Sequence, residues 1–576
     1  MRTNLLYSFL LLIVLPFTTE AQSIVGPGKA VDPYRYSIHK SDNYNKGAVA
    51  TAHPLASLVG AAILKQGGNA VDAAIAVQLT LAVVYPGAGN IGGGGFMVAR
   101  LQNGKTFTLD YRETAPSKAT RDMYVDEQGN AQTDLSQFGH LASGVPGTVS
   151  GLFASMKYAK LPFKSLIQPA IDLAEKGFTL TTSEAKKFDN AQEAFKKYNT
   201  IAPVFVKESG WKAGDTLIQK DLANTLKRIR DKGAAGFYEG ETAKLIVAEM
   251  QRGNGLISLN DLKNYTTKER KPLQFNYKGY TIASMPPPSS GGVLLAQMFK
   301  MVESRPLATY GFETPKSVQL MTEVERRAYA DRAEHLGDPD FWKVPVKEIT
   351  SDAYLTKRMA DYDSTKATKS SGIKAGIAES METTHISIVD RWGNMVSVTT
   401  TLNGNFGSKT VVGGAGFFLN NEMDDFSVKP GVPNMYGAVG GEANAIAPGK
   451  RMLSSMGPTI VLKNKKPFMV VGTPGGTTIP TSVFQTIVDV IDFKMLLTDA
   501  VNKPKFHHQW LPDEIVVENG FPEDVSKELQ QMGYVIKGYH VPGYEVVIGR
   551  VEAIKITNGK LEAVADSRGD DTVAGF

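Results

Sequence analysis

The chain has 576 residues, with 63 Lys and Arg against 58 Asp and Glu, so its formal net charge is +5 at pH 7. The two signs are interspersed, and a small excess without a basic stripe argues against nucleic acid as a partner. The chain has no cysteine, which excludes disulfides, a thiol nucleophile and a cysteine-ligated metal.

Residues 1–21 have the pattern of a signal peptide. Arg2 precedes an apolar run from Leu5 to Phe17 and the small-residue site TEA, and cleavage is expected after Ala21. A run of about 13 residues is too short for a comfortable membrane span, which disfavours an uncleaved anchor. The sequence therefore predicts an exported protein, periplasmic or secreted, that is soluble and free of the membrane once the signal is removed.

Residues 49–82 carry two helical patterns that are interrupted at QGGN. Both are rich in Ala and apolar around much of their circumference, so both are expected to be buried. The glycine-rich segment NIGGGGF follows at residues 90–96, without the Lys-Ser/Thr of a phosphate loop or the acidic partner of a dinucleotide site. We interpret it as backbone in close packing, and the next segment, TFTLDYRE, as a strand.

Helical patterns dominate from about residue 150 to 335. Residues 360–381 are polar and rich in Ser, Lys, Thr and Gly, and we expect them to form an exposed, mobile loop. After Glu382 the pattern changes to strands, namely THISIVD, NMVSVTTTL, TIVLK and PFMVVG. This mixture indicates an α+β fold with helices layered on antiparallel sheets, rather than a regular βαβ series.

The segment DRWGN predicts the turn of a β-hairpin. A three-residue loop with Gly393 in the left-handed conformation pairs Asp390 with Asn394. The same register places Thr383, at the junction of loop and strand, opposite Thr401. A two-residue turn would shift the register by one residue, so the inference depends on this turn type.

A threonine hydroxyl is a weak nucleophile unless a base takes its proton, and the α-amine of a first residue can be that base. The pKa of an α-amine, about 7.7–8.0, suits this role near neutral pH. Thr383 acquires a free amine only if the bond after Glu382 is cut, which its own hydroxyl can do by attacking the preceding carbonyl. Threonine is also an ordinary strand residue, so the junction alone favours a structural role.

An ordered set of motifs resembles the gamma-glutamyltransferase family, also called the glutathione hydrolase family. It covers nearly the whole chain after the signal: GGNAVDAAIA, NIGGGGF, LDYRETAP, SGVPGTVSGL, MPPPSSGG, YADRAEHLGDPDF, TTHISIVDRWGNMVSVTTTLNGNFGS, NNEMDDFSVKPGVPNMYG, GGEANAIAPGKRMLSSMGPTIV, GTPGG, FHHQWLPDEI and DSRGDD. The glycine motifs are weak singly, but the ordered set is specific.

The resemblance implies the N-terminal-nucleophile hydrolase fold, a four-layer αββα sandwich with two antiparallel sheets between helical layers. It also implies a precursor that cuts itself between Glu382 and Thr383. The products would be a mostly helical fragment, residues 22–382, and a β-rich catalytic fragment, residues 383–576, which stay together as a heterodimer. Thr383 is then the nucleophile, and Thr384 is its neighbour on the other face of the strand.

The resemblance assigns further site residues. Thr401 matches the threonine that hydrogen-bonds the nucleophile, and Gly475 and Gly476 match the backbone donors of an oxyanion hole. The residues matched to the charged α-carboxylate and α-amine of a γ-glutamyl group are Arg112, Ser454, Ser455, Asn403, Glu422 and Asp425. Asp424 is an adjacent alternative, for which we favour a structural role.

A lid over the pocket is also implied. Residues 429–445 resemble the lid loop that some family members have and others lack, and Tyr436 matches its tyrosine. A lid here would wall the pocket from bulk water and limit the access of large acceptors.

The resemblance implies that Thr383 attacks the γ-amide of glutathione or another γ-glutamyl compound. Water, or the amine of an amino acid or dipeptide, then resolves the γ-glutamyl enzyme. No cofactor is implied, and His507 and His508 lack metal-ligand spacing, so no metal is expected. The alternatives are a cephalosporin acylase or a poly-γ-glutamate-processing transferase on the same scaffold, and a binding protein that does not process itself.

Overall fold

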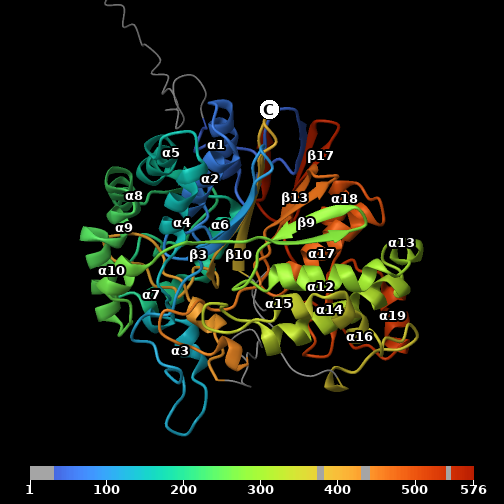
Figure 1. Ribbon diagram of the computed structural model, residues 1–576. Helices are drawn as coiled ribbons and strands as arrows, with labels where there is room; N and C mark the ends of the chain where they lie inside the picture. Colours follow the sequence, from blue (N-terminus) through green and yellow to red (C-terminus); the bar gives the residue numbers. More distant parts are fainter. Residues whose placement is uncertain (1–30, 373–381, 430–440, 540–546) are drawn as a thin grey trace, which may run out of the picture.

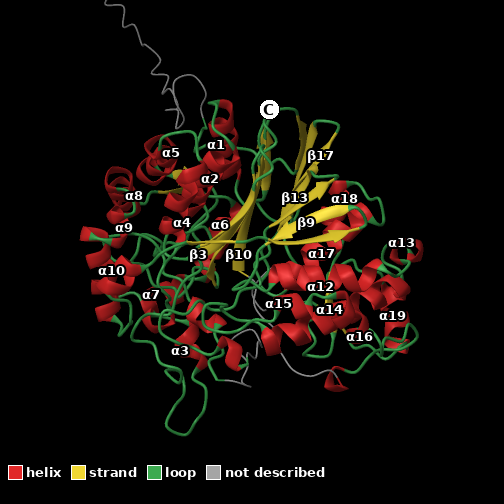
Figure 2. Cartoon of the chain, viewed as in Figure 1, coloured by secondary structure: helices red, strands yellow, loops and turns green. Residues whose placement is uncertain are grey.

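Two seven-stranded antiparallel sheets lie face to face at the centre of the molecule, and helices cover the outer face of each (Figure 1). The computed structural model describes residues 31–372, 382–429, 441–539 and 547–576. Figure 2 shows the strands of both sheets between the two groups of helices. The expected α+β sandwich of antiparallel sheets between helical layers is confirmed.

Both sheets combine strands from the two sides of residue 382. The first sheet has the order β19 (Thr572–Gly575), β2 (Ala48–Thr51), β10 (Glu382–Val389), β11 (Met395–Asn403), β3 (Gly94–Arg100), β4 (Thr106–Asp110) and β7 (Lys268–Arg270). The second has the order β1 (Ser41–Tyr44), β18 (Lys560–Ala565), β17 (Glu552–Thr557), β13 (Lys466–Gly472), β12 (Thr459–Lys463), β9 (Tyr280–Ser284) and β8 (Leu273–Tyr277). The first part of the chain is therefore less purely helical than its pattern indicated.

The two helices expected in residues 49–82 pack on the outer face of the first sheet. α1 (Pro54–Lys65) and α2 (Ala70–Val84) flank the QGGN interruption, and every residue of α2 is buried. The side chain of Asn69 caps α2 by accepting hydrogen bonds from two backbone N–H groups of its first turn. The expected helical span of residues 49–82 was wrong at its start, because residues 48–51 form strand β2.

The other helices divide between the two sides of the sandwich. Those that follow α2 are α3 (Thr133–Gln137), α4 (Thr148–Ser155), α5 (Phe163–Lys176), α6 (Thr182–Asn190), α7 (Gln192–Tyr198), α8 (Lys220–Lys232), α9 (Ala235–Tyr238), α10 (Gly240–Arg252) and α11 (Leu259–Asn264). Those that come later in the chain are α12 (Gly291–Glu303), α13 (Leu307–Tyr310), α14 (Pro315–His335), α15 (Val346–Ile349), α16 (Asp352–Arg358), α17 (Thr478–Ile491), α18 (Leu497–Asn502) and α19 (Glu523–Gln531). In Figure 1, α12, α14 and α17 lie on the side of the second sheet.

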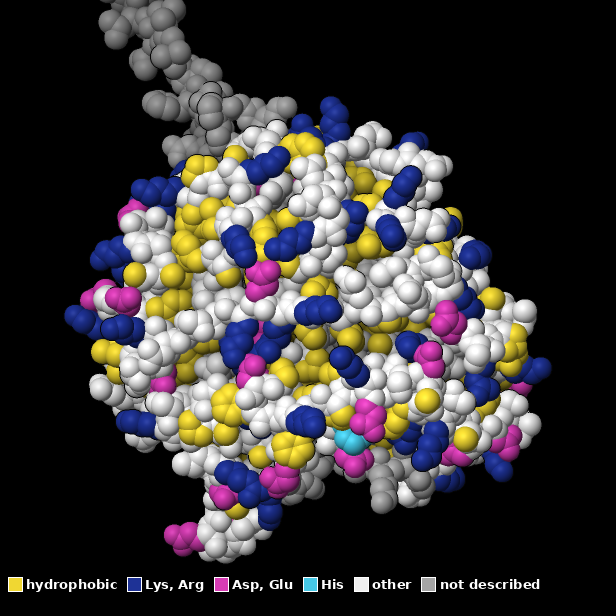
Figure 3. Space-filling view, viewed as in Figure 1, with side chains coloured by type: hydrophobic (Ala, Val, Ile, Leu, Met, Phe, Trp, Pro, Cys, Tyr) yellow, Lys and Arg dark blue, Asp and Glu magenta, His cyan; other side chains and the backbone are white. Residues whose placement is uncertain are grey.

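Lys, Arg, Asp and Glu side chains are scattered over the face shown in Figure 3, as the interspersed sequence indicated. Among the described residues, no helix has the length and apolar character needed to cross a membrane. The expected signal peptide, residues 1–21, lies outside the described residues.

The hairpin β10–β11 has the predicted turn. The N–H of Asp390 donates to the carbonyl of Asn394 over 3.1 Å, and Gly393 has φ of +78°. The predicted register holds for residues 384–389, where Thr384 pairs with Thr400 and Val389 with Met395. At the start of β10 the register shifts, because Glu382 pairs with Asn403. Thr383 therefore lies opposite two residues, Thr401 and its neighbour Leu402, at a β-bulge.

The segment expected to be an exposed loop is partly anchored. In its described part, Ser370 is fully buried, and the N–H of Ala367 donates to the carbonyl of Met532 over 2.8 Å. Two arginines of α14 contact the segment as well, Arg326 at Ser370 and Arg327 at Asp361. The expected exposure holds for most of this described part, whose other residues through Ser371 are exposed or half-buried, and it is wrong at Ser370, which hydrogen-bonds to protein rather than to water. Residues 373–381 lie outside the described residues.

Asp390 ties the hairpin turn to α2, and its loss should destabilise the fold. Its carboxylate accepts four hydrogen bonds, from the N–H groups of Ala70, Trp392 and Asn394 and from the Asn394 amide. We expect Asp390→Ala to lower the free energy of unfolding by about 2–3 kcal/mol, because buried donors lose their acceptor. Urea denaturation measures this change.

The control is Gln102→Ala, at an exposed position of the neighbouring β3–β4 turn. It should stay within about 0.5 kcal/mol of the parent. An Asp390→Ala protein as stable as this control would contradict the assigned role of the carboxylate.

Candidate active site

Thr383 lies on the face of β10 that looks toward the second sheet, and its side chain is 5% exposed. His385 and Ser387 share this face, since alternate residues of a strand point the same way. The Ser387 hydroxyl donates to the carbonyl of Glu552 in β17 over 2.9 Å. His385 lies against Gly472 of β13, where an added Cβ would come within 2.2 Å of the imidazole. The predicted nucleophile is thus one end of a polar stripe between the sheets.

The stripe carries no charge near neutral pH. Nδ1 of His385 lies 2.9 Å from the hydroxyl of Thr399, and Nε2 lies 3.2 Å from the hydroxyl of Ser387. Burial lowers the pKa of His385 to about 3, so the imidazole stays neutral. A neutral imidazole offers one donor and one acceptor, which two hydroxyls can satisfy.

The backbone around Thr401 is held by a residue that the sequence analysis did not select. The Asn90 amide donates to the carbonyl of Thr401 over 2.8 Å and to the hydroxyl of Thr400 over 3.1 Å. Its oxygen accepts from the N–H of Gly93 and the hydroxyl of Thr148. Asn90 begins the NIGGGGF motif, and this position was the feature of the sequence that could have identified it.

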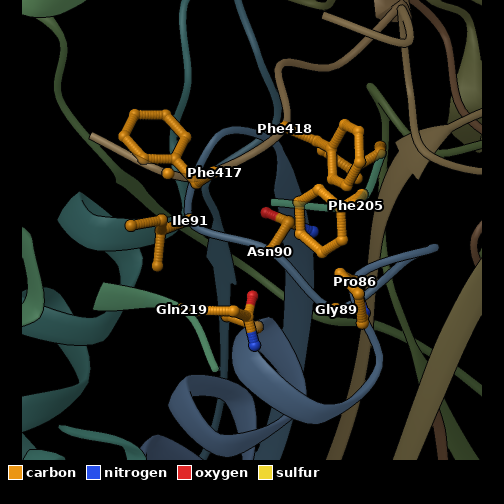
Figure 4. A pocket seen from close by; sticks show the side chains of 11 residues that line it. Pro86, Gly89, Asn90, Ile91, Phe205, Gln219, Phe417 and Phe418 are labelled. Atoms are coloured by element: carbon orange, nitrogen blue, oxygen red, sulfur yellow. The ribbon is translucent and has the colours of Figure 1, made fainter. Parts of the chain in front are cut away.

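The glycines of that motif pack as expected. A Cβ on Gly93 would lie 2.2 Å from the carbonyl oxygen of Thr401, and one on Gly92 would lie 2.1 Å from that of Phe418. A small cavity adjoins this contact and is bordered by Asn90, Phe418 and Leu402 (Figure 4). The glycines of the motif therefore allow its backbone to pack directly against the backbone at Thr401 and Phe418.

Arg112 follows β4 and is 1% exposed. Its Nη1 lies 2.5 Å from a carboxylate oxygen of Glu422 and 3.6 Å from one of Glu113, while Nη2 donates to Asp425. The guanidinium also donates to the carbonyl oxygens of Met452 and Leu453, each over 3.3 Å. The Arg112 guanidinium thus contacts three carboxyl groups and the two residues that directly precede Ser454 and Ser455.

This cluster has more acidic groups than cations. Burial raises the pKa of Glu422 to about 8 and that of Glu113 to about 8, although Arg112 opposes the shift in both. Both carboxyl groups therefore bind protons more tightly than free glutamic acid does. Glu113 was not among the predicted site residues, and its place beside Arg112 in LDYRETAP was the signal for it.

A hydrogen-bond path joins the cluster to the hairpin. The N–H of Asn403 donates to the hydroxyl of Thr401 over 2.8 Å, and the Asn403 amide donates to the carbonyl of Asn421 over 3.1 Å. Asn421 directly precedes Glu422, which begins the short 3-10 helix Glu422–Asp425. The predicted nucleophile side and the predicted charge-binding side thus form one site.

The serine pair is held from two directions. The N–H of Ser290 donates to the carbonyl of Ser454 over 2.6 Å, and Arg332 of α14 donates to the hydroxyl of Ser455 over 3.2 Å. Arg332 is a third residue that the sequence analysis missed, and it is 4% exposed. It orients a hydroxyl of the site, and its place in the motif YADRAEHLGDPDF was the feature of the sequence that could have identified it.

Gly475 and Gly476 form the turn between β13 and α17, with φ of +136° and +55°. The carbonyl of Gly475 accepts from the N–H of Thr478 over 3.0 Å, which closes the first turn of the helix. The left-handed region favours glycine at both positions. The turn begins just beyond Gly472, which packs on His385, so it lies at the same end of the sheets as Thr383.

Asp424, Tyr436 and the expected absence of a metal are the predictions that remain. Asp424 accepts a hydrogen bond from the hydroxyl of Ser136, as suits the structural role favoured for it. Tyr436 lies outside the described residues, as does most of the expected lid. Within the described part of the chain, no group of three or more His, Asp or Glu could hold a metal ion.

Replacing Glu422 by glutamine should change how stability depends on pH. The folded pKa of Glu422, about 8, lies above the reference value of 4.5, so between these values the folded state holds more protons than the unfolded state. The stabilising effect of this group is present below pH 4.5 and is lost as the pH rises through 8.

The unfolding free energy of the parent minus that of Glu422→Gln should therefore fall between pH 5 and pH 8. The slope has an upper limit of about 1.4 kcal/mol per pH unit. Urea denaturation of both proteins at several pH values measures it. A difference that stayed constant, or grew with pH, would contradict the raised pKa.

Known proteins resemble this chain over most of its length. The family model described as Gamma-glutamyltranspeptidase matches residues 56–576. The "Glutathione hydrolase proenzyme" of Escherichia coli (strain K12) is 46% identical over 539 residues, which is 92% of this chain and 92% of the relative.

Two crystal structures are similar as well. The cephalosporin acylase from Bacillus halodurans has a TM-score of 0.82 at 27% identity, covering 96% of this chain and 99% of that one. The gamma-glutamyltranspeptidase of Helicobacter pylori has a TM-score of 0.55 at 45% identity, covering 56% of this chain and 93% of that one. From the family match and the identity to its relatives, the chain belongs to the gamma-glutamyltranspeptidase family.

Proposed function

We propose that this protein is a self-processing gamma-glutamyltransferase and glutathione hydrolase whose nucleophile is Thr383. The observation that carries the proposal is the bulge that sets Thr383 opposite Thr401, joined through Asn403 to the carboxyl cluster at Arg112. A hydroxyl nucleophile and a charged binding site for an α-amino acid are what γ-glutamyl transfer requires.

The first reaction is self-cleavage. The Thr383 hydroxyl attacks the carbonyl carbon of Glu382, the peptide C–N bond breaks, and the nitrogen takes a proton to become the α-amine. Water then hydrolyses the resulting ester and frees both the Glu382 carboxylate and the Thr383 hydroxyl. The "proenzyme" in the name of the Escherichia coli relative supports this step. The Helicobacter pylori chain supports it as well, because 56% of this chain covers 93% of that one. This is the size relation expected between a precursor and one of its cleavage products.

The two products stay together because their strands interleave. Residues 383–576 supply β10, β11 and β12, and residues 22–382 supply their partners β2, β3 and β9. Cutting the bond before Thr383 leaves these backbone ladders in place. The mature enzyme is therefore a heterodimer of its own fragments.

In catalysis the free α-amine of Thr383 takes the hydroxyl proton as oxygen attacks the γ-carbonyl of the donor. Backbone N–H groups at Gly475 and Gly476 stabilise the oxyanion that forms. The amine returns the proton to the departing nitrogen, for example that of cysteinylglycine from glutathione. Water, an amino acid or a dipeptide then attacks the γ-glutamyl ester.

The charged end of the donor binds at the carboxyl cluster. The α-carboxylate pairs with Arg112 and the hydroxyls of Ser454 and Ser455, and the α-ammonium pairs with Asp425, Glu422 and Asn403. Before binding, Glu422 and Asp425 occupy the guanidinium themselves. A zwitterion exchanges these contacts for new ones of the same signs, so the desolvated charges remain paired.

The setting of the reaction is proposed from the sequence. Residues 1–21 direct export to the periplasm or the outside of the cell, and the lid with Tyr436 covers the bound donor. The reaction needs no cofactor.

Thr383→Ala should give one uncut, inactive chain. The parent should give two bands near 40 and 20 kDa in denaturing electrophoresis, at about 110 Da per residue. Thr384→Ala is the matched control, because it removes the neighbouring hydroxyl on the other strand face and should still be cut. A Thr383→Ala chain that splits in two would refute the nucleophile.

The choice of donor separates this proposal from the cephalosporin acylase alternative, which the similarity to the Bacillus halodurans enzyme keeps open. A γ-glutamyl anilide should be turned over and a glutaryl-cephalosporin should not. Arg112→Lys should lower kcat/KM for the anilide about 10- to 100-fold, because lysine cannot form the planar bidentate contact. Turnover of the cephalosporin alone would overturn the substrate assignment.

A further inference from the structure

Both sheets have an end, remote from the candidate active site, at which consecutive strands are joined by short turns. β10 runs from Thr383 at the site to the turn that begins at Asp390, and it is about 20 Å long at about 3.3 Å per residue. The C-terminus lies at the same end (Figure 1), because Gly575 of β19 pairs with Ala48, which pairs with Val389 of β10. We call this end of the sandwich the turn end.

Six turns between consecutive strands lie at the turn end, and each carries lysine or arginine. The two sheets meet there, since the Arg100 guanidinium at the end of β3 donates to the carbonyl of Lys465 between β12 and β13 over 3.2 Å. The one acidic residue in these turns, Asp390, is 3% exposed. The cations in or directly beside the turns are Lys46 (β1–β2), Lys105 (β3–β4), Lys278 (β8–β9), Arg391 (β10–β11), Lys463, Lys465 and Lys466 (β12–β13) and Lys560 (β17–β18).

Most of these cations are exposed and have no acidic partner. Lys105 pairs with Glu269, and Lys278 pairs with Asp492. The other cations in the turns are exposed and form no ion pair with any residue that the structure describes, namely Lys46, Arg391, Lys463, Lys465, Lys466 and Lys560. Unpaired charges of one sign repel one another, and an anionic partner relieves that repulsion.

A tryptophan lies among the cations. Nζ of Lys160, just before α5, is 3.5 Å from the ring centroid of Trp392, and the Arg391 guanidinium is 5.6 Å from the same ring. Lys65, the last residue of α1, lies over the ring of the C-terminal Phe576 in the same way, at 5.5 Å. Cation–π contacts thus keep charge and aromatic surface together. Tryptophan flanked by cations is typical of the boundary between water and a lipid bilayer.

The cations are spread over a broad surface. The second sheet alone measures about 29 Å from β1 to β8, at about 4.8 Å between neighbouring strands. In Figure 3, Lys and Arg side chains outnumber Asp and Glu side chains at the upper end of the molecule, where Figure 1 marks the C-terminus. A single small anion reaches few of these cations, whereas an extended anionic surface reaches many of them.

We propose that the turn end binds the surface of a phospholipid bilayer that contains anionic lipids. Each lysine or arginine close to such a surface strengthens binding about fivefold. Phospholipid is favoured over nucleic acid because the proposed export takes the protein to a compartment where the bilayer is the abundant anionic surface. Trp392 adds an aromatic side chain suited to the headgroup region.

This contact is peripheral and is reversed by salt, so it differs from the membrane anchor that the sequence disfavoured. It does revise the expectation that the mature chain is free of the membrane. Because Thr383 lies at the opposite end of β10, the candidate active site of the bound protein faces away from the lipid. Binding at the turn end goes beyond the proposed function and does not require Thr383 to be the nucleophile.

Sedimentation with vesicles tests the proposal. The purified protein is mixed with vesicles of phosphatidylcholine alone, or with vesicles in which one-third of the lipid is phosphatidylglycerol. It should sediment with the anionic vesicles at low salt and be released at high salt, roughly 0.05 M and 0.5 M, because salt screens exposed charges. It should stay in solution with phosphatidylcholine alone.

Two double variants remove the same charge from different ends of the molecule. Lys465→Gln with Lys466→Gln should lower the partition coefficient onto anionic vesicles about 25-fold, at about fivefold for each charge. Lys118→Gln with Lys343→Gln is the control, because both lysines are exposed and lie on segments that hydrogen-bond to residues 450–451 beside the candidate site. The control should bind as the parent does. Without vesicles, both variants should keep the kcat, KM and thermal midpoint of the parent.

Four outcomes would overturn the proposal. They are a parent that stays in solution with anionic vesicles at low salt, equal binding to vesicles of phosphatidylcholine alone, an equal loss of binding in the two double variants, and tighter binding to duplex DNA than to anionic vesicles at the same phosphate concentration. The last would assign the turn end to nucleic acid. None of them bears on the proposed function, which a parental chain that stays uncut would refute separately.

Discussion

The backbone ladder of β10 is the constraint on which the rest of the structure depends. Residues 386–389 pair with β2 on one side and with β11 on the other, so this half of the strand is fixed in the middle of a sheet. The other half, which begins at the predicted cleavage point, pairs with β11 up to the bulge at Thr383. The strand therefore has a rigid body and an irregular tip, and the tip carries the nucleophile of the proposed reaction.

The bulge also determines how the charged end of the site is attached. Because β11 has one residue more than β10 at this point, its last residue, Asn403, turns back with φ of +73° and reaches both Thr401 and Asn421. The arginine cluster lies one residue further on, at Glu422. A regular ladder would continue the strand past this point and separate the hydroxyl from the charges.

The arginine cluster gives a physical reason for the charged ligand of the proposed function. Three carboxyl groups around one buried guanidinium are unbalanced, and burial raises the pKa of two of them to about 8. In the proposed donor complex, an incoming ammonium stabilises the ionised form of these acids, and an incoming carboxylate takes up the arginine that they release. Under the proposed function, the residues whose burial is costly therefore favour an α-amino acid group over a neutral ligand.

The sequence by itself determined what depends on neighbouring residues. The helices at Pro54–Lys65 and Ala70–Val84, the turn at Gly393 and the register of residues 384–389 follow from local patterns, and the structure confirms them. The ordered motifs indicated the family, which the comparisons with its members confirm. The placement of Thr383 within one residue of its partner came from turn geometry alone.

Only the tertiary structure decided which distant residues complete the site. Asn90 and Arg332 support it from 311 and 123 positions away in the chain, at Thr401 and Ser455. Both lie in recognised motifs, but a local motif does not show which distant residue its side chain contacts. The polar segment before residue 373 was expected to be exposed, and Ser370 is the exception, because composition reports which groups need hydrogen bonds and not which partners supply them. Ser370 finds those partners on α14 and on the FHHQWLPDEI motif, and only folding brings these together.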